Sequence, residues 1–573
     1  MSEPPCTVAD ETKSSRNRAR AASTTIPVGE AVGIALARLG IRRAFGVVGS
    51  GNFHFTNGLV TGGVKFVAAR HEAGAATMAD SYARMRGEVA VVSVHQGCGL
   101  TNSITGIGEA AKSRTPLLVV SGETADPASN FYMDQDALAR SVGAATVRVR
   151  SSATALADVR AAYALALRDR RTVLLNLPLH IQSETLETVQ LEKLEPMSAL
   201  AQPQAAPQII LAFAELLKTA RRPVFIAGRG ARGREARHAL LRLADDTGAL
   251  LAEGAVSKGL FAGQPWAIDV AGGFSSPLTA ELIAGADVVV GWGSALNMWT
   301  TAHGRLLKED VRLVQVDLDA MAIGRNRPVA LGIVGDVAAT ALATSELLRA
   351  HGHHSSGYRT RELQRRIESG ISWRDTPYED AGTATTIDPR TLSLALDGLM
   401  PQDRVVSVDS GNFMGYPSMY LRVPDENGFA FTQAFQSIGL GLATGIGAAL
   451  SQPARFPVVA CGDGGFLMGI AEMETAVRLQ LGMLIVVYND HAYGAEVYCF
   501  GPDGHPTGTV EFPDTDIAAI ARGFGADGLT VRCRSDLRPV AEMVARGLTR
   551  PLVVDAKIVG GSAWWHQQAM KGQ

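Results

Sequence analysis

Two aspartates at the ends of apolar runs have the spacing of a divalent cation site. Asp463 follows the run FPVVACG, and Asp490, 27 residues later, ends the run GMLIVVYND. One strand–helix–strand unit has this length, and in a parallel sheet both strand ends would lie at the carboxyl edge, where ligands bind. Carboxylates suit a Mg²⁺ ion that shares its coordination shell with a diphosphate, and Gly462, Gly464 and Gly465 would let backbone amides approach the phosphate oxygens. Two unrelated turns are the alternative.

Three residues in the first hundred positions could take part in acid–base or substrate-binding chemistry. Glu72 lies between the apolar run VKFVAA and a small-residue stretch that predicts a helix, where the helix dipole also favours a glutamate without any catalytic role. His95 follows the run VAVVSV, and histidine titrates close enough to neutral pH to relay protons. Ser50 lies in the turn of FGVVGSGN. A turn serine and a hydrogen-bonded histidine at a strand end are the plain alternatives.

The elements that must position these residues follow a repeated βα pattern. Apolar runs of strand length alternate with amphipathic stretches, which is typical of parallel sheets covered by helices on both faces. We predict α/β architecture with three doubly wound, mainly parallel-sheet domains at residues 26–185, 205–345 and 385–560. The expected strands are 44–49, 64–69, 89–94, 116–122 and 172–178, then 222–228, 248–254, 286–293 and 311–319, and finally 404–411, 456–465, 482–490 and 551–559.

Three segments lack this pattern. Residues 1–25 are polar and carry both charge signs, so we predict a disordered tail. Residues 183–207 contain three prolines and predict a surface linker. The polar stretch 351–373 predicts a second linker with one charged helix.

Composition excludes several classes of function. The formal net charge of −2 argues against a surface that neutralises nucleic acid. No apolar stretch is long enough to span a membrane, and no secretory signal is visible. The cysteines are odd in number and show no C-x-x-C spacing, which argues against disulfide frameworks and zinc sites: Cys6, Cys98, Cys461, Cys499 and Cys533. We therefore expect a cytoplasmic protein with no nucleic acid or membrane partner.

The segment 462–490, GDGGFLMGIAEMETAVRLQLGMLIVVYND, resembles the thiamine diphosphate signature, in which GDG is followed one helix and one strand later by a pair of asparagines. The segments RHE (70–72), HQGCGLTN (95–102) and FTQAFQSIGLGLATGIGAAL (431–450) resemble other parts of the same enzymes, in the same order. Over nearly its whole length, the chain resembles the acetolactate synthase, benzoylformate decarboxylase and pyruvate decarboxylase superfamily. Its three domains would then be pyrimidine-binding, central Rossmann-like and diphosphate-binding.

This resemblance implies roles for individual residues. Glu72 would hydrogen-bond the pyrimidine ring and activate the cofactor, and Ile438 would wedge it into a bent shape. Mg²⁺ would be bound by Asp463, by Asp490 in place of the family's asparagine, and by the backbone carbonyl of Ala492. The remaining cofactor-binding residues would be Gly411, Asn412, Gly462, Gly464 and Gly465.

Four positions bear on the substrate, and they point in different directions. Ser50 and His95 match a substrate-binding serine and an active-site histidine of benzoylformate decarboxylase. Gln135 matches a glutamine of acetolactate synthases and benzaldehyde lyase that contacts the bound intermediate or acceptor. Glu496 falls where pyruvate decarboxylases have a catalytic glutamate. For Gln135 and Glu496 a surface position is the alternative.

The resemblance implies thiamine diphosphate- and Mg²⁺-dependent decarboxylation of a 2-oxo acid, with release of the enamine or its carboligation to an aldehyde or oxo acid acceptor. A C–C lyase or hydrolase that acts without decarboxylation is the alternative within the superfamily. Because the family's cofactor site is shared between subunits, we expect a homodimer or homotetramer.

A motif of another class lies in the central domain. The turn 228–233, GRGARG, follows the run PVFIA, and Glu253 comes 20 residues after it, as in nicotinamide dinucleotide-binding domains. A nicotinamide-dependent dehydrogenase is therefore a further hypothesis. The family's central domain holds FAD in acetolactate synthases, but their Arg-Phe-Asp-Asp-Arg segment is replaced here by GWGSALNMW (291–299), so we do not expect FAD.

Overall fold

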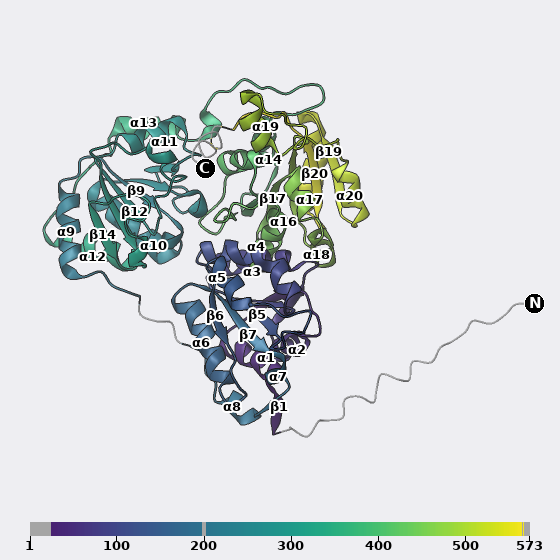
Figure 1. The fold of residues 1–573 in the computed structure, drawn as a ribbon. Helices are drawn as coiled ribbons and strands as arrows, with labels where there is room; N and C mark the ends of the chain where they lie inside the picture. Colours follow the sequence, from purple (N-terminus) through teal and green to yellow (C-terminus); the bar gives the residue numbers. More distant parts are fainter. Residues whose placement is uncertain (1–23, 198–201, 564, 566–573) are drawn as a thin grey trace, which may run out of the picture.

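The structure is a computed structural model that describes residues 24–197, 202–563 and 565. Figure 1 shows three domains, each built on a six-stranded sheet with helices on both faces. All neighbouring strands within these three sheets are parallel, and each sheet grows outward in both directions from its first strands. The predicted fold class is confirmed. No helix among the described residues combines the length and apolar character needed to cross a membrane.

The N-terminal domain, at the bottom of Figure 1, has the strand order β3-β2-β4-β5-β7-β6. Helices α1 and α6 cover one face of its sheet, and α3 and α4 cover the other. The strands are β2 (Arg43–Gly46), β3 (Lys65–Ala68), β4 (Ala90–Val94), β5 (Leu117–Glu123), β6 (Ala145–Arg148) and β7 (Thr172–Pro178). The helices are α1 (Val28–Leu39), α2 (Phe53–Thr61), α3 (Glu72–Arg86), α4 (Cys98–Lys112), α5 (Gln135–Ser141), α6 (Ala155–Arg168) and α7 (Leu179–Gln182).

The central domain, on the left of Figure 1, has the strand order β11-β10-β9-β12-β13-β14. One face packs against α9, α10 and α12, and the other against α11 and α13. The strands are β9 (Pro223–Ala227), β10 (Leu250–Glu253), β11 (Ala267–Val270), β12 (Val288–Trp292), β13 (Arg312–Asp317) and β14 (Leu331–Val334). The helices are α9 (Pro207–Lys218), α10 (Arg234–Thr247), α11 (Pro277–Ala284), α12 (Val337–Ala350) and α13 (Arg361–Gly370).

The C-terminal domain has the strand order β16-β15-β17-β18-β20-β19. Helices α14 and α21 pack on one face of the sheet, and α16, α18 and α20 pack on the other. The strands are β15 (Arg404–Val408), β16 (Phe429–Phe431), β17 (Phe456–Gly462), β18 (Leu484–Asn489), β19 (Asp527–Val531) and β20 (Leu552–Lys557). The helices are α14 (Pro389–Leu399), α15 (Gly415–Tyr420), α16 (Gly441–Ser451), α17 (Asp463–Met468), α18 (Glu472–Arg478), α19 (Gly494–Phe500), α20 (Ile517–Gly523) and α21 (Leu537–Arg546).

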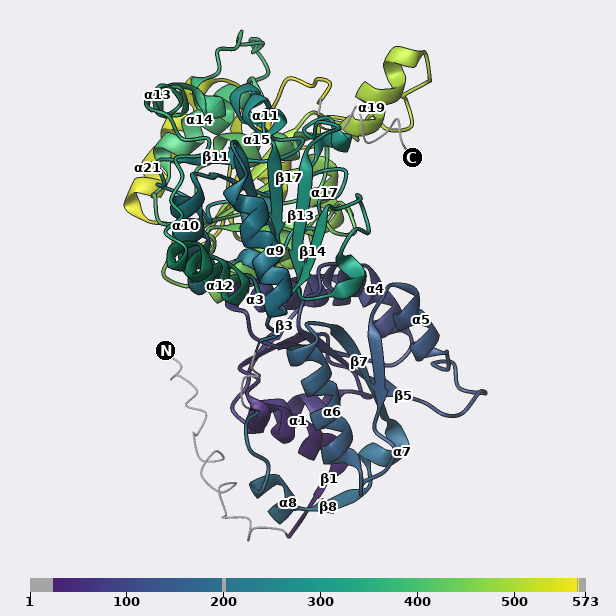
Figure 2. The same cartoon turned by 90° about the vertical axis from the view of Figure 1, so that its left-hand side faces the viewer.

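Helices α3 and α16 join the N-terminal and C-terminal domains. One apolar core continues from the N-terminal sheet through these helices into the C-terminal sheet. The Ser81 hydroxyl donates to the Thr444 carbonyl at 2.8 Å across this contact. Figure 2 shows α3 and α4 at the junction with the two upper domains. The N-terminal domain is therefore held directly against helix α16 of the C-terminal domain.

Two of the predicted unpatterned segments differ from expectation. Residues 1–23 of the predicted tail lie outside the described residues, but Thr25 already belongs to β1 (Thr25–Pro27), which pairs antiparallel with β8 (Thr185–Glu187). The predicted linker 183–207 thus contributes a strand, followed by α8 (Thr188–Glu192). The second predicted linker does contain one charged helix, α13.

Candidate active site

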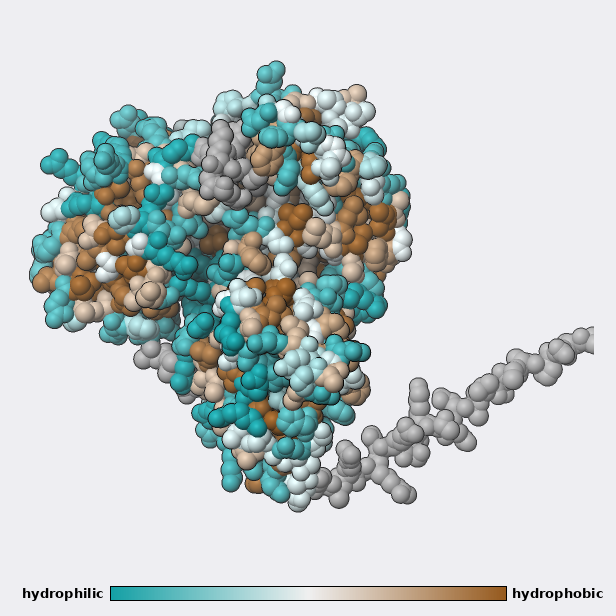
Figure 3. All heavy atoms as spheres, viewed as in Figure 1, coloured by the Kyte–Doolittle hydropathy of each residue, from teal (hydrophilic) through white to brown (hydrophobic). Residues whose placement is uncertain are grey.

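A cavity of about 1950 Å³ lies where the three domains meet. Figure 3 shows the surface hollowed between the central domain and the other two domains. All nine residues that sequence analysis assigned to the cofactor and metal in the C-terminal half, together with Glu496, line this cavity. Those lining it are Gly411, Asn412, Ile438, Gly462, Asp463, Gly464, Gly465, Asp490, Ala492 and Glu496.

Asp463 and Asp490 follow the neighbouring strands β17 and β18. Burial raises the pKa of Asp463 to about 6, and burial together with the Asp463 charge raises the pKa of Asp490 to about 7. The Asp463 charge thus destabilises the charged form of Asp490, which a divalent cation between them would relieve. In the described part of the chain no group of three His, Cys, Asp or Glu side chains could hold a metal, so a third protein ligand would be of another kind, such as a backbone oxygen.

The turn after β18 places such an oxygen nearby. His491 has a left-handed backbone conformation, with φ of 59°, between Asp490 and Ala492. Among the described residues, none donates a hydrogen bond to the Ala492 carbonyl. This carbonyl is available as the third ligand that the family resemblance implies.

Glycines next to the two aspartates form a cradle that a larger residue would fill. A Cβ atom at Gly494 would lie 2.6 Å from a carboxylate oxygen of Asp490, and one at Gly465 would lie 2.5 Å from a carboxylate oxygen of Asp409. Backbone amides can approach an anion closely at such positions. The cradle and the aspartate pair therefore fit a diphosphate bound through a cation.

Asp409, which sequence analysis did not select, holds the turn that leads into α16. Its buried carboxylate accepts hydrogen bonds from the amides of Ser410 (2.9 Å), Gly439 (3.0 Å) and Leu440 (3.2 Å), at the start of α16. Burial raises its pKa to about 7. Asp409 thereby fixes the turn that follows Ile438. Its place at the end of a strand, as for Asp463, is the signal that could have identified it.

Glu72 begins helix α3 at the carboxyl edge of the N-terminal sheet. The Asn102 side chain donates to the Glu72 carboxylate at 3.1 Å. The preceding backbone is held by Glu472 of the C-terminal domain, which accepts from the amides of Arg70 (3.1 Å) and His71 (3.0 Å). The contacts with Asn102 and Glu472 join distant segments, and sequence analysis missed both partners.

His95 and Ser50 lie together at the same edge. His95 Nδ1 is 2.8 Å from the Gln96 carbonyl, and His95 Nε2 is 3.4 Å from the Ser50 hydroxyl. Because a carbonyl can only accept, Nδ1 carries the proton in the neutral ring, and Nε2 presents its lone pair towards Ser50. The Phe131 ring packs against the imidazole, with centroids 4.9 Å apart. His95 is thus held in one tautomer and orientation.

Gln135 lies beside them but is turned into the fold. Its side chain is 2% exposed and accepts from the Gly97 amide at 3.2 Å. Its own amide group donates to the Gly122 carbonyl at 3.0 Å and to Asn176 at 2.8 Å. These bonds favour a role for Gln135 in holding the strand ends in place.

The predicted site residues therefore form two groups. Ser50, Glu72, His95 and Gln135 follow consecutive strands of the N-terminal sheet, and none of them lines the cavity that holds the aspartate pair. The two groups thus lie at different places in a single chain, and that two subunits share a site stays a prediction.

Comparison with known protein families agrees with this geometry. The N-terminal binding-domain model of the thiamine pyrophosphate enzymes matches residues 26–143, the central-domain model matches 210–344, and the C-terminal binding-domain model matches 409–556. The chain belongs to the thiamine pyrophosphate enzymes. Thiamine pyrophosphate is the thiamine diphosphate that the sequence motifs indicated.

Relatives of this thiamine pyrophosphate enzyme differ in their named activities. Sulfoacetaldehyde acetyltransferase of Alcaligenes xylosoxydans xylosoxydans is 27% identical, with 88% of each chain covered. The acetolactate synthase large subunit of Parasynechococcus marenigrum is 25% identical, covering 94% of this chain and 89% of the relative. A probable 2-ketoarginine decarboxylase of Pseudomonas aeruginosa is 29% identical, and the match covers 87% of this chain and 89% of the relative.

The glycine-rich turn of the central domain links the domains of this thiamine pyrophosphate enzyme. Both oxygens of Glu253 accept backbone amides, from Gly259 at 2.6 Å and Phe261 at 3.0 Å. Arg229 and Arg232, both in the turn, donate to carbonyls of the N-terminal and C-terminal domains, each at 2.7 Å. With the family assigned, these contacts leave the dehydrogenase hypothesis without support. That the central domain lacks FAD stays a prediction.

Proposed function

We propose that the protein decarboxylates a 2-oxo acid with thiamine diphosphate and Mg²⁺ as cofactors, and that it releases the product or joins it to an aldehyde or a second oxo acid. The observation that carries the proposal is the pair of the buried Asp463 and the half-buried Asp490 beside a glycine cradle. Relatives named as an acetolactate synthase and a probable 2-ketoarginine decarboxylase support an oxo acid substrate.

The residues of the chain would divide the work between the two groups. When bound, thiamine diphosphate supplies a nucleophilic carbon at C2 of its thiazolium ring and accepts the electron pair left by departing CO₂. Asp463, Asp490 and the Ala492 carbonyl would hold Mg²⁺ against the diphosphate. Glu72 would exchange a proton with the pyrimidine ring nitrogen. His95 Nε2, held towards Ser50, would carry protons to and from the substrate.

Two measurements test this proposal. Mass spectrometry of the denatured protein should release thiamine diphosphate, and release of a dinucleotide alone would contradict the cofactor assignment. A screen of pyruvate, branched-chain and aryl 2-oxo acids, with CO₂ and products measured, should find at least one substrate. Aldehyde products would indicate simple release, and hydroxyketone products would indicate carboligation. A loaded enzyme that releases CO₂ from none of them would refute decarboxylation.

A second candidate function follows from the relatives. Several are named sulfoacetaldehyde acetyltransferases, and a sulfoaldehyde has no carboxylate to lose as CO₂. As the alternative to decarboxylation, their similarity favours an enzyme that cleaves its substrate and transfers an acyl group without releasing CO₂. Adding sulfoacetaldehyde to the same screen, with acetyl products measured, separates the two functions.

Assembly into at least a dimer is our next prediction. Glu72 and His95 do not line the cavity that contains the proposed cofactor-binding groups, and in our proposal a second copy supplies them. Apolar side chains are exposed on both sides: Val48, Phe53 and Tyr132 on the N-terminal domain, and Met468 and Phe500 on the C-terminal domain. In our proposal these exposed apolar side chains lie in the contact between two copies.

Light scattering should therefore give a mass of at least twice the 60.3 kDa of one chain. Phe53→Asp should shift the equilibrium towards monomer and lower activity together, because it places a charge in the interface. Met321→Asp is the matched control, since Met321 is an exposed methionine on the central domain. A monomer that keeps full specific activity would refute the shared site.

A further inference from the structure

The loop 432–439 connects β16 to α16 and forms part of the cavity wall. Gln433, Gln436 and Ile438 of this loop line the cavity. The C-terminal domain holds the end of the loop that leads into α16, where Ser410 donates to the Gln436 carbonyl at 3.4 Å and Asp409 accepts from the Gly439 amide. At the start of the loop, the Thr444 hydroxyl donates to the Thr432 hydroxyl at 3.2 Å. Further contacts of the loop come from the N-terminal domain.

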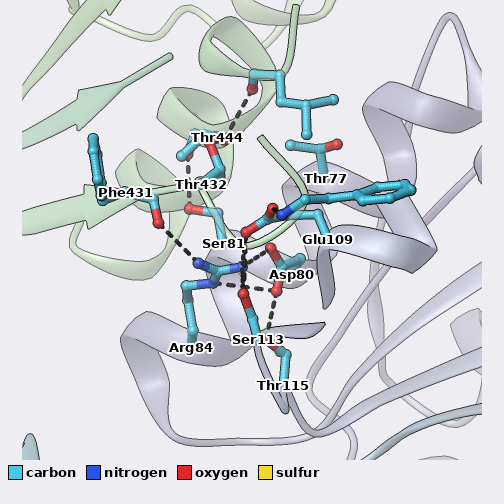
Figure 4. Close-up of polar contacts among 12 residues, drawn as sticks. Thr77, Asp80, Ser81, Arg84, Glu109, Ser113, Thr115, Phe431, Thr432 and Thr444 are labelled. Atoms are coloured by element: carbon cyan, nitrogen blue, oxygen red, sulfur yellow. Dashed lines mark hydrogen bonds and ion pairs between the residues drawn. The ribbon is translucent and has the colours of Figure 1, made fainter. Parts of the chain in front are cut away.

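Two charged side chains of the N-terminal domain hold the other end of the loop. Arg84 of α3 donates to the Phe431 carbonyl at 3.1 Å, and Glu109 of α4 accepts from the Phe435 amide at 2.7 Å. Figure 4 shows Arg84 reaching the Phe431 carbonyl across the junction, with Glu109 nearby. The loop is thus attached at its start and its middle to another domain.

Arg84 and Glu109 are themselves held by a buried network. The Arg84 guanidinium lies 3.2 Å from Glu109, pairs with Asp80 and donates to the Ser113 hydroxyl at 3.0 Å. Burial alone would raise the pKa of Glu109, but Arg84 and the Phe435 amide hold it below its ordinary value. Both anchors are therefore charged and fixed in place.

The Phe435 ring adds an apolar contact to these polar anchors. A Cβ atom at Gly108 of α4 would lie 2.8 Å from the ring, so only glycine leaves room for it. The Lys112 ammonium lies 5.2 Å from the ring centroid on the same helix. Phe435 is 40% exposed, so its ring serves this contact more than it fills a core.

We propose that Glu109, Arg84 and Gly108 are positioning residues for the loop 432–439. Through this loop, the N-terminal domain sets the cofactor affinity of the C-terminal domain in the same chain. The inference rests on the proposed function, because it takes the cavity as the thiamine diphosphate site. It adds a coupling through the loop 432–439: if Phe435 is displaced, Gln433, Gln436 and Ile438 lose their fixed places in the cavity wall.

Gly108→Ala tests this coupling without opening the buried ion pair, whose removal would destabilise the fold. Alanine favours a helix more than glycine does, so the melting temperature of the apoprotein should stay the same or rise. The added methyl group displaces the Phe435 ring, and the Kd for thiamine diphosphate with Mg²⁺ should increase roughly threefold to tenfold. Gly398→Ala is the matched control, because Gly398 also lies in a helix but its Cβ would meet open space.

A double-mutant cycle identifies the route of the effect. Phe435→Ala should also raise the Kd, and Gly108→Ala/Phe435→Ala should be no worse than Phe435→Ala alone, because no ring is left to displace. Calorimetric titration of each variant gives the four values. An unchanged Kd in Gly108→Ala, or additive effects in the double variant, would overturn the inference. Failure of the wild-type protein to bind thiamine diphosphate would instead overturn the proposed function.

Discussion

Glu72→Gln is expected to slow turnover by about 10²–10⁴-fold, the usual contribution of a general acid–base group. The substitution keeps the size of the side chain and its capacity to bond Asn102, which donates to Glu72 at 3.1 Å. It removes the exchangeable carboxyl proton. The aspartate pair and the glycine cradle lie in the other group of residues, so the affinity for thiamine diphosphate should change far less than turnover.

Deuterium exchange at C2 of the bound cofactor, followed by quenched-flow NMR, measures the activation step directly. Exchange should slow by the same order as turnover in Glu72→Gln. Glu88→Gln is a suitable control, since Glu88 is a partly exposed glutamate that pairs with nearby Arg86. Near-normal C2 exchange in Glu72→Gln would rule out the role given to this carboxylate and would leave the cofactor assignment intact.

Sequence analysis found the strands that lie between two neighbouring strands more readily than the strands at the sheet edges. Every interior strand of the three sheets was predicted, because such strands are apolar at consecutive positions. Five of the six edge strands were missed, and only β3 was found. An edge strand buries less surface because it has a neighbouring strand on one side alone. Accordingly, β19 (Asp527–Val531) and β6 (Ala145–Arg148) are mostly half-buried or exposed. The missed strands are β6, β11, β14, β16 and β19.

The residues of the candidate site also differ in whether the local sequence could identify them. Asp463 and Asp490 could be predicted because each follows its own apolar strand, at a spacing that one βα unit imposes. The contact of Glu109 with Phe435 joins residues 326 positions apart, and nothing in either local sequence indicates the other. Glu253 shows the opposite failure: its spacing fits a dinucleotide site, but the fold uses its carboxylate to cap backbone amides.

Asp463→Ala is expected to raise the Kd for thiamine diphosphate with Mg²⁺ by more than about 100-fold, since even groups that only orient metal ligands contribute 10–100-fold. Asp490→Asn is the matched comparison: it keeps an oxygen ligand and restores the family's asparagine, so it should retain binding.

The apoprotein provides the control for folding. Burial raises the pKa of Asp463 to about 6, above the pKa of an aspartate in the unfolded chain. The charged carboxylate therefore lowers the free energy of unfolding of the apoprotein, and this loss is complete once the pH is above the folded pKa. At pH 8 the melting temperature of the Asp463→Ala apoprotein should therefore equal or exceed that of the wild type. Unchanged affinity in a calorimetric titration of Asp463→Ala would show that this carboxylate does not hold the metal.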